Sequence, residues 1–252
     1  MQAFYNAFAY EFHLMKNILY RLCATMLLVP LVIRLGYRTQ RAFTPFETAY
    51  AVLGAPFFVL GFIGLFALMA VRICAPWRSA RAAYTMLTLP CGRLAVYLAR
   101  IAALLTALAM FWASAVVNVL ISYAFFMWQA QPFSGDIWSL VELRNGLFLA
   151  LVRSPFLRIV LPLSGFNVWV VASTALSLTC SLYHGILCVR ARKVPVTDFA
   201  ALLLAVLAIA GMLSYRSGVT LFDLAAVAGA SSVLILFHLW HGWRLVRTRA
   251  VI

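Results

Sequence analysis

The chain has 252 residues, of which 65% are hydrophobic and 10% are charged, and its formal net charge is +14. Soluble domains are about 45–50% apolar and about 25% charged, so this composition excludes an ordinary water-soluble domain. The 20 basic residues are spread along the chain, which argues against a nucleic-acid-binding surface. A helical membrane protein explains both features, because lipid covers apolar faces and Lys and Arg collect at cytoplasmic helix ends.

The first 16 residues carry Glu11, His13 and Lys16 and do not match a cleavable signal peptide. Residues 4–14 instead place phenylalanines at four-residue spacing. This spacing puts the aromatic rings on one helical face and predicts an N-terminal elbow helix along the inner membrane surface.

Six segments predict transmembrane helices, because a spanning helix needs roughly 20 mostly apolar residues. In chain order they cover residues 18–36, 49–71, 98–126, 167–189, 199–215 and 224–243. The first is marginal, since Arg21 and Arg34 lie near its ends and have to extend toward the headgroups. Thr197 and Asp198 fit a cap and an acidic first turn at the start of the fifth. We therefore predict an all-α, polytopic membrane protein that forms a single domain over residues 1–252.

Residues 137–152 carry leucines on one helical face and polar residues opposite, and predict an amphipathic segment on the outer membrane surface. The alternative is a seventh, partly inserted or re-entrant segment that continues to Leu161. An N-terminus inside the cell places most of the 20 basic residues on the cytoplasmic side. Six spans then predict that both termini are cytoplasmic in a cell inner or plasma membrane.

Few residues carry recognisable chemistry. The six acidic residues fall in predicted loops or at helix ends, and we find no nucleophile–base pair, so we predict that the chain is not an enzyme. We interpret His184 as a packed or interface-facing histidine, with a proton relay as the alternative. His238 and His241, three residues apart, could share a metal ion on one helical face. Because no third ligand is near them in the sequence, we interpret them as interfacial polar residues and assign no metal or cofactor.

Polar and small residues within the predicted spans indicate helix packing. The polar ones predict interhelical hydrogen bonds, with a wet translocation path as the alternative: Asn118, Asn167, Ser173, Thr174, Ser177 and Thr179. The small ones predict close helix approach: Gly61, Gly64, and the pairs Ala225/Gly229 and Ala226/Ala230.

The loop after the second predicted span carries the most informative pattern. Ser79 can cap a short helix that Pro90 ends, and Tyr84 and Leu87 give this helix an apolar side. Arginines frame it on both sides, so it could rest on the cytoplasmic headgroups or dock into a cytoplasmic partner.

The stretch Tyr84-Thr85-Met86-Leu87-Thr88-Leu89-Pro90, followed by Arg93, Tyr97 and Arg100, resembles the coupling-helix region of type-2 ABC transporter permeases. The predicted elbow helix, six spans, inner termini and outer element resemble that family as well. This chain differs from the family pattern in having Cys91-Gly92 after the proline, Arg100 where lysine is usual, and no acidic residue in the loop.

The resemblance implies a permease that pairs with an identical or homologous copy and moves substrate, in the export direction, by alternating access. It implies two ATPase subunits that bind ATP and Mg²⁺, because this chain has no G-x-x-x-x-G-K-[ST] loop. The residues that it assigns to the ATPase contact are Ser79, Arg81, Tyr84, Leu87, Thr88, Leu89, Pro90 and Arg93. The substrate stays unassigned. The alternatives are a stand-alone secondary carrier, a non-transporting accessory protein and, third, a membrane-embedded enzyme.

Overall fold

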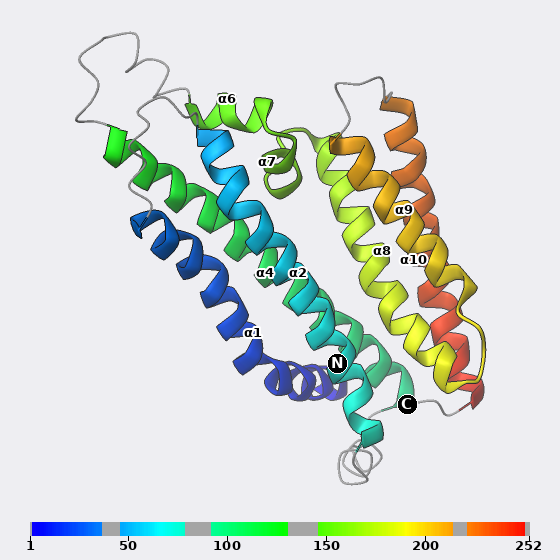
Figure 1. The fold of residues 1–252 in the computed structure, drawn as a ribbon. Coiled ribbons are helices and arrows are strands. Elements are labelled where there is room, and N and C mark those ends of the chain that lie inside the picture. The colour runs from blue at the N-terminus through cyan, green and yellow to red at the C-terminus, as the bar shows by residue number, and fades with distance from the viewer. Residues whose placement is uncertain (1, 37–45, 79–91, 131–145, 214–220, 250–252) are drawn as a thin grey trace. The chain divides into compact units, whose positions relative to one another are not determined.

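The structure is a computed structural model that describes residues 2–36, 46–78, 92–130, 146–213 and 221–249. These residues form helices and short connections and contain no strand, which confirms the predicted all-α class (Figure 1). The helices are α1 (Gln2–Gly36), α2 (Phe46–Arg78), α4 (Arg93–Ala130), α6 (Gly146–Arg153), α7 (Pro155–Val160), α8 (Gly165–Arg190), α9 (Val196–Leu213) and α10 (Leu221–Arg249).

Five stretches within these helices are long and apolar enough to cross a bilayer, and they identify a multi-pass membrane protein. They are Gly54–Ala75, Arg93–Trp128, Gly165–Arg190, Val196–Leu213 and Phe222–Arg247. The five stretches do not include residues 18–36, the first of the six predicted spans, which lie within α1.

Helix α1 runs without a break through both the predicted elbow and the predicted first span. The rings of Phe4, Phe8 and Phe12 stack at centroid distances of 6.4 and 6.0 Å, so they share one face as predicted. A separate elbow helix stays a prediction. Thr197 lies inside α9, one residue after its start, and Asp198 lies in the first turn as predicted.

The chain divides into two compact units, each assembled from segments that are distant in the sequence. The first unit comprises Met1–Leu19, Leu65–Ala109 and Trp169–Ile252, and the second comprises Tyr20–Gly64 and Met110–Val168. Helices α1, α2 and α4 each contribute one segment to both units, whereas α9 and α10 belong to the first alone.

In the first unit, α9 buries its small residues and exposes its large apolar ones. Ala201, Ala205 and Ala208 are buried, while Leu202 and Leu203 are 59% and 60% exposed. A soluble helix shows the opposite arrangement, since its large apolar residues face the core. Small residues inside and leucines outside are typical of a helix that packs closely against a neighbour and faces lipid, and α9 packs against α10.

The predicted small-residue contacts are only partly present. In α10, Ala226 and Ala230 are exposed, and a Cβ added at Gly229 would meet nothing within 4 Å. The buried face of α10 instead contains Leu224, Ala228 and Ser231. Within the described residues of one chain, Ala226, Gly229 and Ala230 therefore make no close helix contact, and the packing predicted for these pairs stays a prediction.

The hydroxyl groups of α8 bond to their own helix. Ser173 and Thr174 donate to the carbonyl of Val170, and Thr179 donates to the carbonyl of Ala175. Serine and threonine commonly satisfy a buried hydroxyl in this way, three or four residues back along the helix. The predicted interhelical bonds are thus wrong for these three residues.

In the second unit, Asn118 confirms the prediction of an interhelical hydrogen bond. Its side chain is buried on α4, accepts from the Tyr50 hydroxyl on α2 at 2.8 Å, and donates to the Leu27 carbonyl on α1 at 3.1 Å. Close approach is also confirmed at Gly61, where an added Cβ would lie 2.6 Å from the Met26 sulfur. One amide and one glycine therefore join α1, α2 and α4.

The outer segment predicted at 137–152 is described from Gly146 onward, where it is helical. Ser154 separates α6 from α7, and its hydroxyl caps α7 by accepting from the Leu157 amide at 3.3 Å. The Trp112 indole of α4 donates to the carbonyl of Val160 at the end of α7. With eight and six residues, α6 and α7 are each too short to cross a bilayer.

Replacing Asn118 should destabilise the helix assembly, because Asn118→Ala removes two hydrogen bonds between helices. We expect a loss of about 1–2 kcal/mol in unfolding free energy, measured by denaturant titration in mixed micelles. The matched control is Val117→Ala on the adjacent, 42% exposed position of α4. Equal stability of the two variants would contradict a packing role for this amide.

Candidate functional site

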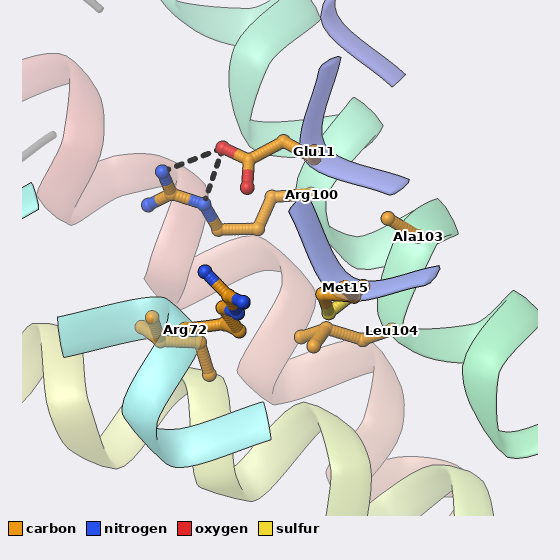
Figure 2. Close-up of a pocket in the computed structure, with 7 residues that line it drawn as sticks. Glu11, Met15, Arg72, Arg100, Ala103 and Leu104 are labelled. Carbon is orange, nitrogen blue, oxygen red and sulfur yellow. Dashed lines mark hydrogen bonds and ion pairs between the residues drawn. The ribbon is translucent and has the colours of Figure 1, made fainter. Parts of the chain in front are cut away.

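A buried ion pair joins α1 and α4 in the first unit. Arg100 is 4% exposed and Glu11 is 6% exposed. The Nε and Nη2 atoms of Arg100 both donate to Oε1 of Glu11, at 3.0 and 2.7 Å (Figure 2). The prediction that all acidic residues lie in loops or at helix ends is wrong for Glu11, because α1 continues through the predicted elbow.

The pair lines a small hollow, and Figure 2 shows Arg72 of α2 pointing into the same space. Met15 and Leu104 supply apolar walls. The Arg72 Nε atom is buried and has no hydrogen-bond partner in the part of the chain that the structure describes. The hollow therefore holds two guanidinium groups and one carboxylate from three helices.

Tyr97 extends this network to two more helices. Its hydroxyl donates to the Leu239 carbonyl of α10 at 3.0 Å, and its ring stacks on Tyr183 of α8 at 5.5 Å. The Arg100 guanidinium lies over the same Tyr183 ring, 5.9 Å from the ring centre. Gly242 leaves room for this contact, since an added Cβ would lie 2.6 Å from the Tyr97 oxygen. Contacts of Tyr97 and Arg100 thus attach the first two turns of α4 to α1, α8 and α10.

A second cluster forms where α8, α9 and α10 lie side by side (Figure 1). His184 of α8 places Nδ1 3.0 Å from Oδ1 of Asp198, at the start of α9. His238 of α10 places Nε2 3.3 Å from the same oxygen. On the other side of the His184 ring, Nε2 lies 2.7 Å from Nδ1 of His241.

Because these side chains are buried away from water, each of their polar atoms needs a partner within the protein or a bound ligand. His184 and His238 are 3% and 1% exposed. Neither nitrogen of His238 has a hydrogen-bond partner among the described residues, and neither does Oδ2 of Asp198. The 3.3 Å approach of His238 to Asp198 is thus a close contact without hydrogen-bond alignment. Among the residues that the structure describes, two groups of three side chains could hold a metal ion: His184 with Asp198 and His238, and His184 with Cys188 and His241.

Most residues predicted to contact an ATPase lie in 79–91, outside the described residues: Ser79, Arg81, Tyr84, Leu87, Thr88, Leu89 and Pro90. Arg93 is the first residue of α4 and is exposed. The predicted coupling contact therefore stays a prediction.

The sequence interpretation missed the histidine cluster. His184 is packed, as predicted, but His238 is buried, which corrects its interpretation as an interfacial residue. Asp198 was predicted only as a helix start, although it belongs to this cluster. A usable signal existed, since His184 and Asp198 lie 14 positions apart across the short turn between two apolar helices.

The ion pair of Arg100 with Glu11 should behave as a coupled unit. Either Glu11→Gln or Arg100→Met should cost about 3–5 kcal/mol in unfolding free energy, because each leaves a buried charge unpaired. The double variant should cost less than the sum of the two, which denaturant titration in micelles measures. Arg93→Met, on an exposed turn of the same helix, is the control and should change little. Strict additivity of the two substitutions would show that the pair is not coupled.

Comparisons of the chain with protein-family models, curated proteins and solved structures find no match. The function is therefore argued from the residues and geometry of this chain.

Proposed function

We propose that the chain is the permease subunit of an ATP-driven membrane exporter of the type-2 ABC class. The observation that carries the proposal is the stretch from Tyr84 to Pro90, followed by Arg93, Tyr97 and Arg100, in the segment that follows the apolar stretch Gly54–Ala75. In this proposal α1 supplies the sixth span, both termini are cytoplasmic, and a second permease copy completes the translocation path.

ATP hydrolysis is assigned to separate subunits, because the sequence contains no phosphate-binding G-x-x-x-x-G-K-[ST] loop. An apolar side chain in a groove is the usual anchor of such a subunit contact. Tyr84 and Leu87 fit this role, since the sequence pattern predicts that they form the apolar side of a short helix in this loop.

The contacts of Tyr97 and Arg100 support a role for the start of α4, which follows this loop, in transmitting movement to other helices. Arg100 pairs with Glu11 of α1, and Tyr97 bonds to α10 and stacks on α8. These contacts are buried, so a displacement of the start of α4 has to move several helices together. A push from ATPase closure on residues 79–90 would reach α4 first and then these helices. This is the coupling that alternating access requires.

The coupling role predicts that Tyr84→Ala combined with Leu87→Ala weakens the association with an ATPase subunit. Insertion and folding should stay intact, because both residues lie outside the apolar spans. The measurement is recovery of the ATPase with wild-type and variant permease at equal expression, together with transport-linked ATP hydrolysis. We expect both to fall at least tenfold, about the effect of losing 1.4 kcal/mol of binding free energy.

The matched control is Val194→Ala, an exposed apolar residue in another loop that is predicted to be cytoplasmic. It should leave recovery and hydrolysis unchanged. Unchanged recovery and transport in the Tyr84/Leu87 variant would reject the coupling assignment and favour a helix that merely rests on lipid headgroups.

A further inference from the structure

Three helices of the first unit bring two imidazoles and one carboxylate together in a buried position. From this geometry we propose that Nδ1 of His184, the carboxylate of Asp198 and Nε2 of His238 bind one divalent transition-metal ion, such as Zn²⁺. The ligand atoms lie within 4.8 Å of one another and come from α8, α9 and α10. This inference does not depend on the proposed transport function.

The distances suit a tetrahedral ion. Zn²⁺ lies about 2.0–2.2 Å from nitrogen and oxygen ligands, which holds neighbouring ligand atoms about 3.3–3.5 Å apart. Oδ1 of Asp198 lies 3.0 Å from Nδ1 of His184 and 3.3 Å from Nε2 of His238. These two separations match the spacing of ligand atoms around one ion. The rings of His184 and His238 are stacked with centroids 4.8 Å apart, so binding also requires the rings to rotate until both lone pairs point at the ion.

Atoms without partners point to a ligand at this position. Nε2 of His238 and Oδ2 of Asp198 are buried and have no hydrogen-bond partner among the described residues. Buried polar atoms are nearly always satisfied, because an unmet donor or acceptor carries its full desolvation cost. An ion bound to these side chains supplies the partner that Nε2 of His238 lacks, and it offers the unpartnered carboxylate of Asp198 a cation to bind.

The surroundings of His184 and Asp198 resemble the outer shell of a metal site. Metal-bound imidazoles usually form a hydrogen bond through their second nitrogen, and bound carboxylates are themselves hydrogen-bonded. Here Nε2 of His184 lies 2.7 Å from His241, and the Ser181 hydroxyl donates to Oδ1 of Asp198 at 3.1 Å. Gly185 provides the space for the carboxylate, since an added Cβ would lie 2.7 Å from Oδ2 of Asp198.

A second group of ligands, His184 with Cys188 and His241, is less well directed. The Cys188 sulfur lies 3.4 Å from Nε2 and 3.8 Å from Nδ1 of His184. Because the sulfur is almost equally far from both ring nitrogens, it lies along the lone-pair direction of neither. Two imidazoles with a carboxylate also select Zn²⁺, Fe²⁺ or a similar ion over Ca²⁺ and Mg²⁺, which prefer all-oxygen sites.

The test uses the full chain, purified in detergent through a tag that contains no histidine and freed of metal by a chelator. Titration with Zn²⁺ should show one ion bound per chain by calorimetry and by elemental analysis. His184→Ala and His238→Ala should abolish this binding. His241→Gln should weaken it by roughly 10–100-fold, as expected for an outer-shell partner.

Two substitutions serve as controls. His13→Ala removes an exposed histidine on α1, and Cys188→Ser removes the neighbouring thiol; both should bind Zn²⁺ like the wild type. The metal-free unfolding curves of all variants should be compared with that of the wild type. Absence of stoichiometric binding to the wild type, or full binding by His238→Ala, would overturn the proposal.

Spectroscopy of the wild type keeps the test valid if a variant fails to fold. Co²⁺ in place of Zn²⁺ should give visible bands of a nitrogen- and oxygen-bound ion, without a thiolate-to-cobalt charge-transfer band. A strong thiolate band that disappears in Cys188→Ser would place the ion on the Cys188 group and refute the proposed ligand set.

Discussion

Burying charged and polar side chains among apolar helices requires partners, because removing an ion from water costs several kcal/mol even after the protein relaxes. The first unit meets this requirement at Arg100, whose guanidinium is held by Glu11 and packs over Tyr183. The second unit meets it at Asn118, which bonds to both Tyr50 and the Leu27 backbone. In each unit, one buried polar side chain joins segments that are far apart in the sequence, because its burial requires hydrogen-bond or ion-pair partners from those segments.

In the histidine cluster, the described residues do not supply a partner for every buried polar atom. His238 is as deeply buried as Asn118, yet its two nitrogens have no hydrogen-bond partner there. An ion bound to His184, Asp198 and His238 would join α8, α9 and α10 in the way that Arg100 and Tyr97 join α4 to its neighbours. The two proposals rest on different side chains, Tyr97 and Arg100 for the coupling contact and His184, Asp198 and His238 for the ion site. They share α8 and α10, where Tyr97 contacts Tyr183 and Leu239, the neighbours of His184 and His238. Either can fail without the other.

Much of the fold follows from the sequence, because an uncharged apolar run has few alternatives to a spanning helix. The apolar runs within α2, α4, α8, α9 and α10 are of this kind and were predicted from composition and length. Helix α1 was harder, since one continuous helix covers both the predicted elbow and the predicted first span, and Glu11 is buried within it, paired with Arg100. The short turn between α8 and α9 could have suggested that His184 lies near Asp198, but the addition of His238 depends on the rotation at which α10 packs, which the sequence does not reveal. The unknown rotation of α10 also explains why close packing was predicted at Ala226 and Ala230, although both residues lie on an exposed side of this helix.

The central claim is that α1 is a sixth span and that both termini are cytoplasmic, as a permease coupled to cytoplasmic ATPases requires. The most direct test replaces the native cysteines and introduces single cysteines at Ala3 and Ala250, with Ser217 as the site expected outside. Intact cells are then treated with a membrane-impermeant thiol reagent. The account predicts labelling at 217 in intact cells, and labelling at 3 and 250 only after the membrane is permeabilised. Labelling of one terminus in intact cells would show an odd number of spans and contradict it.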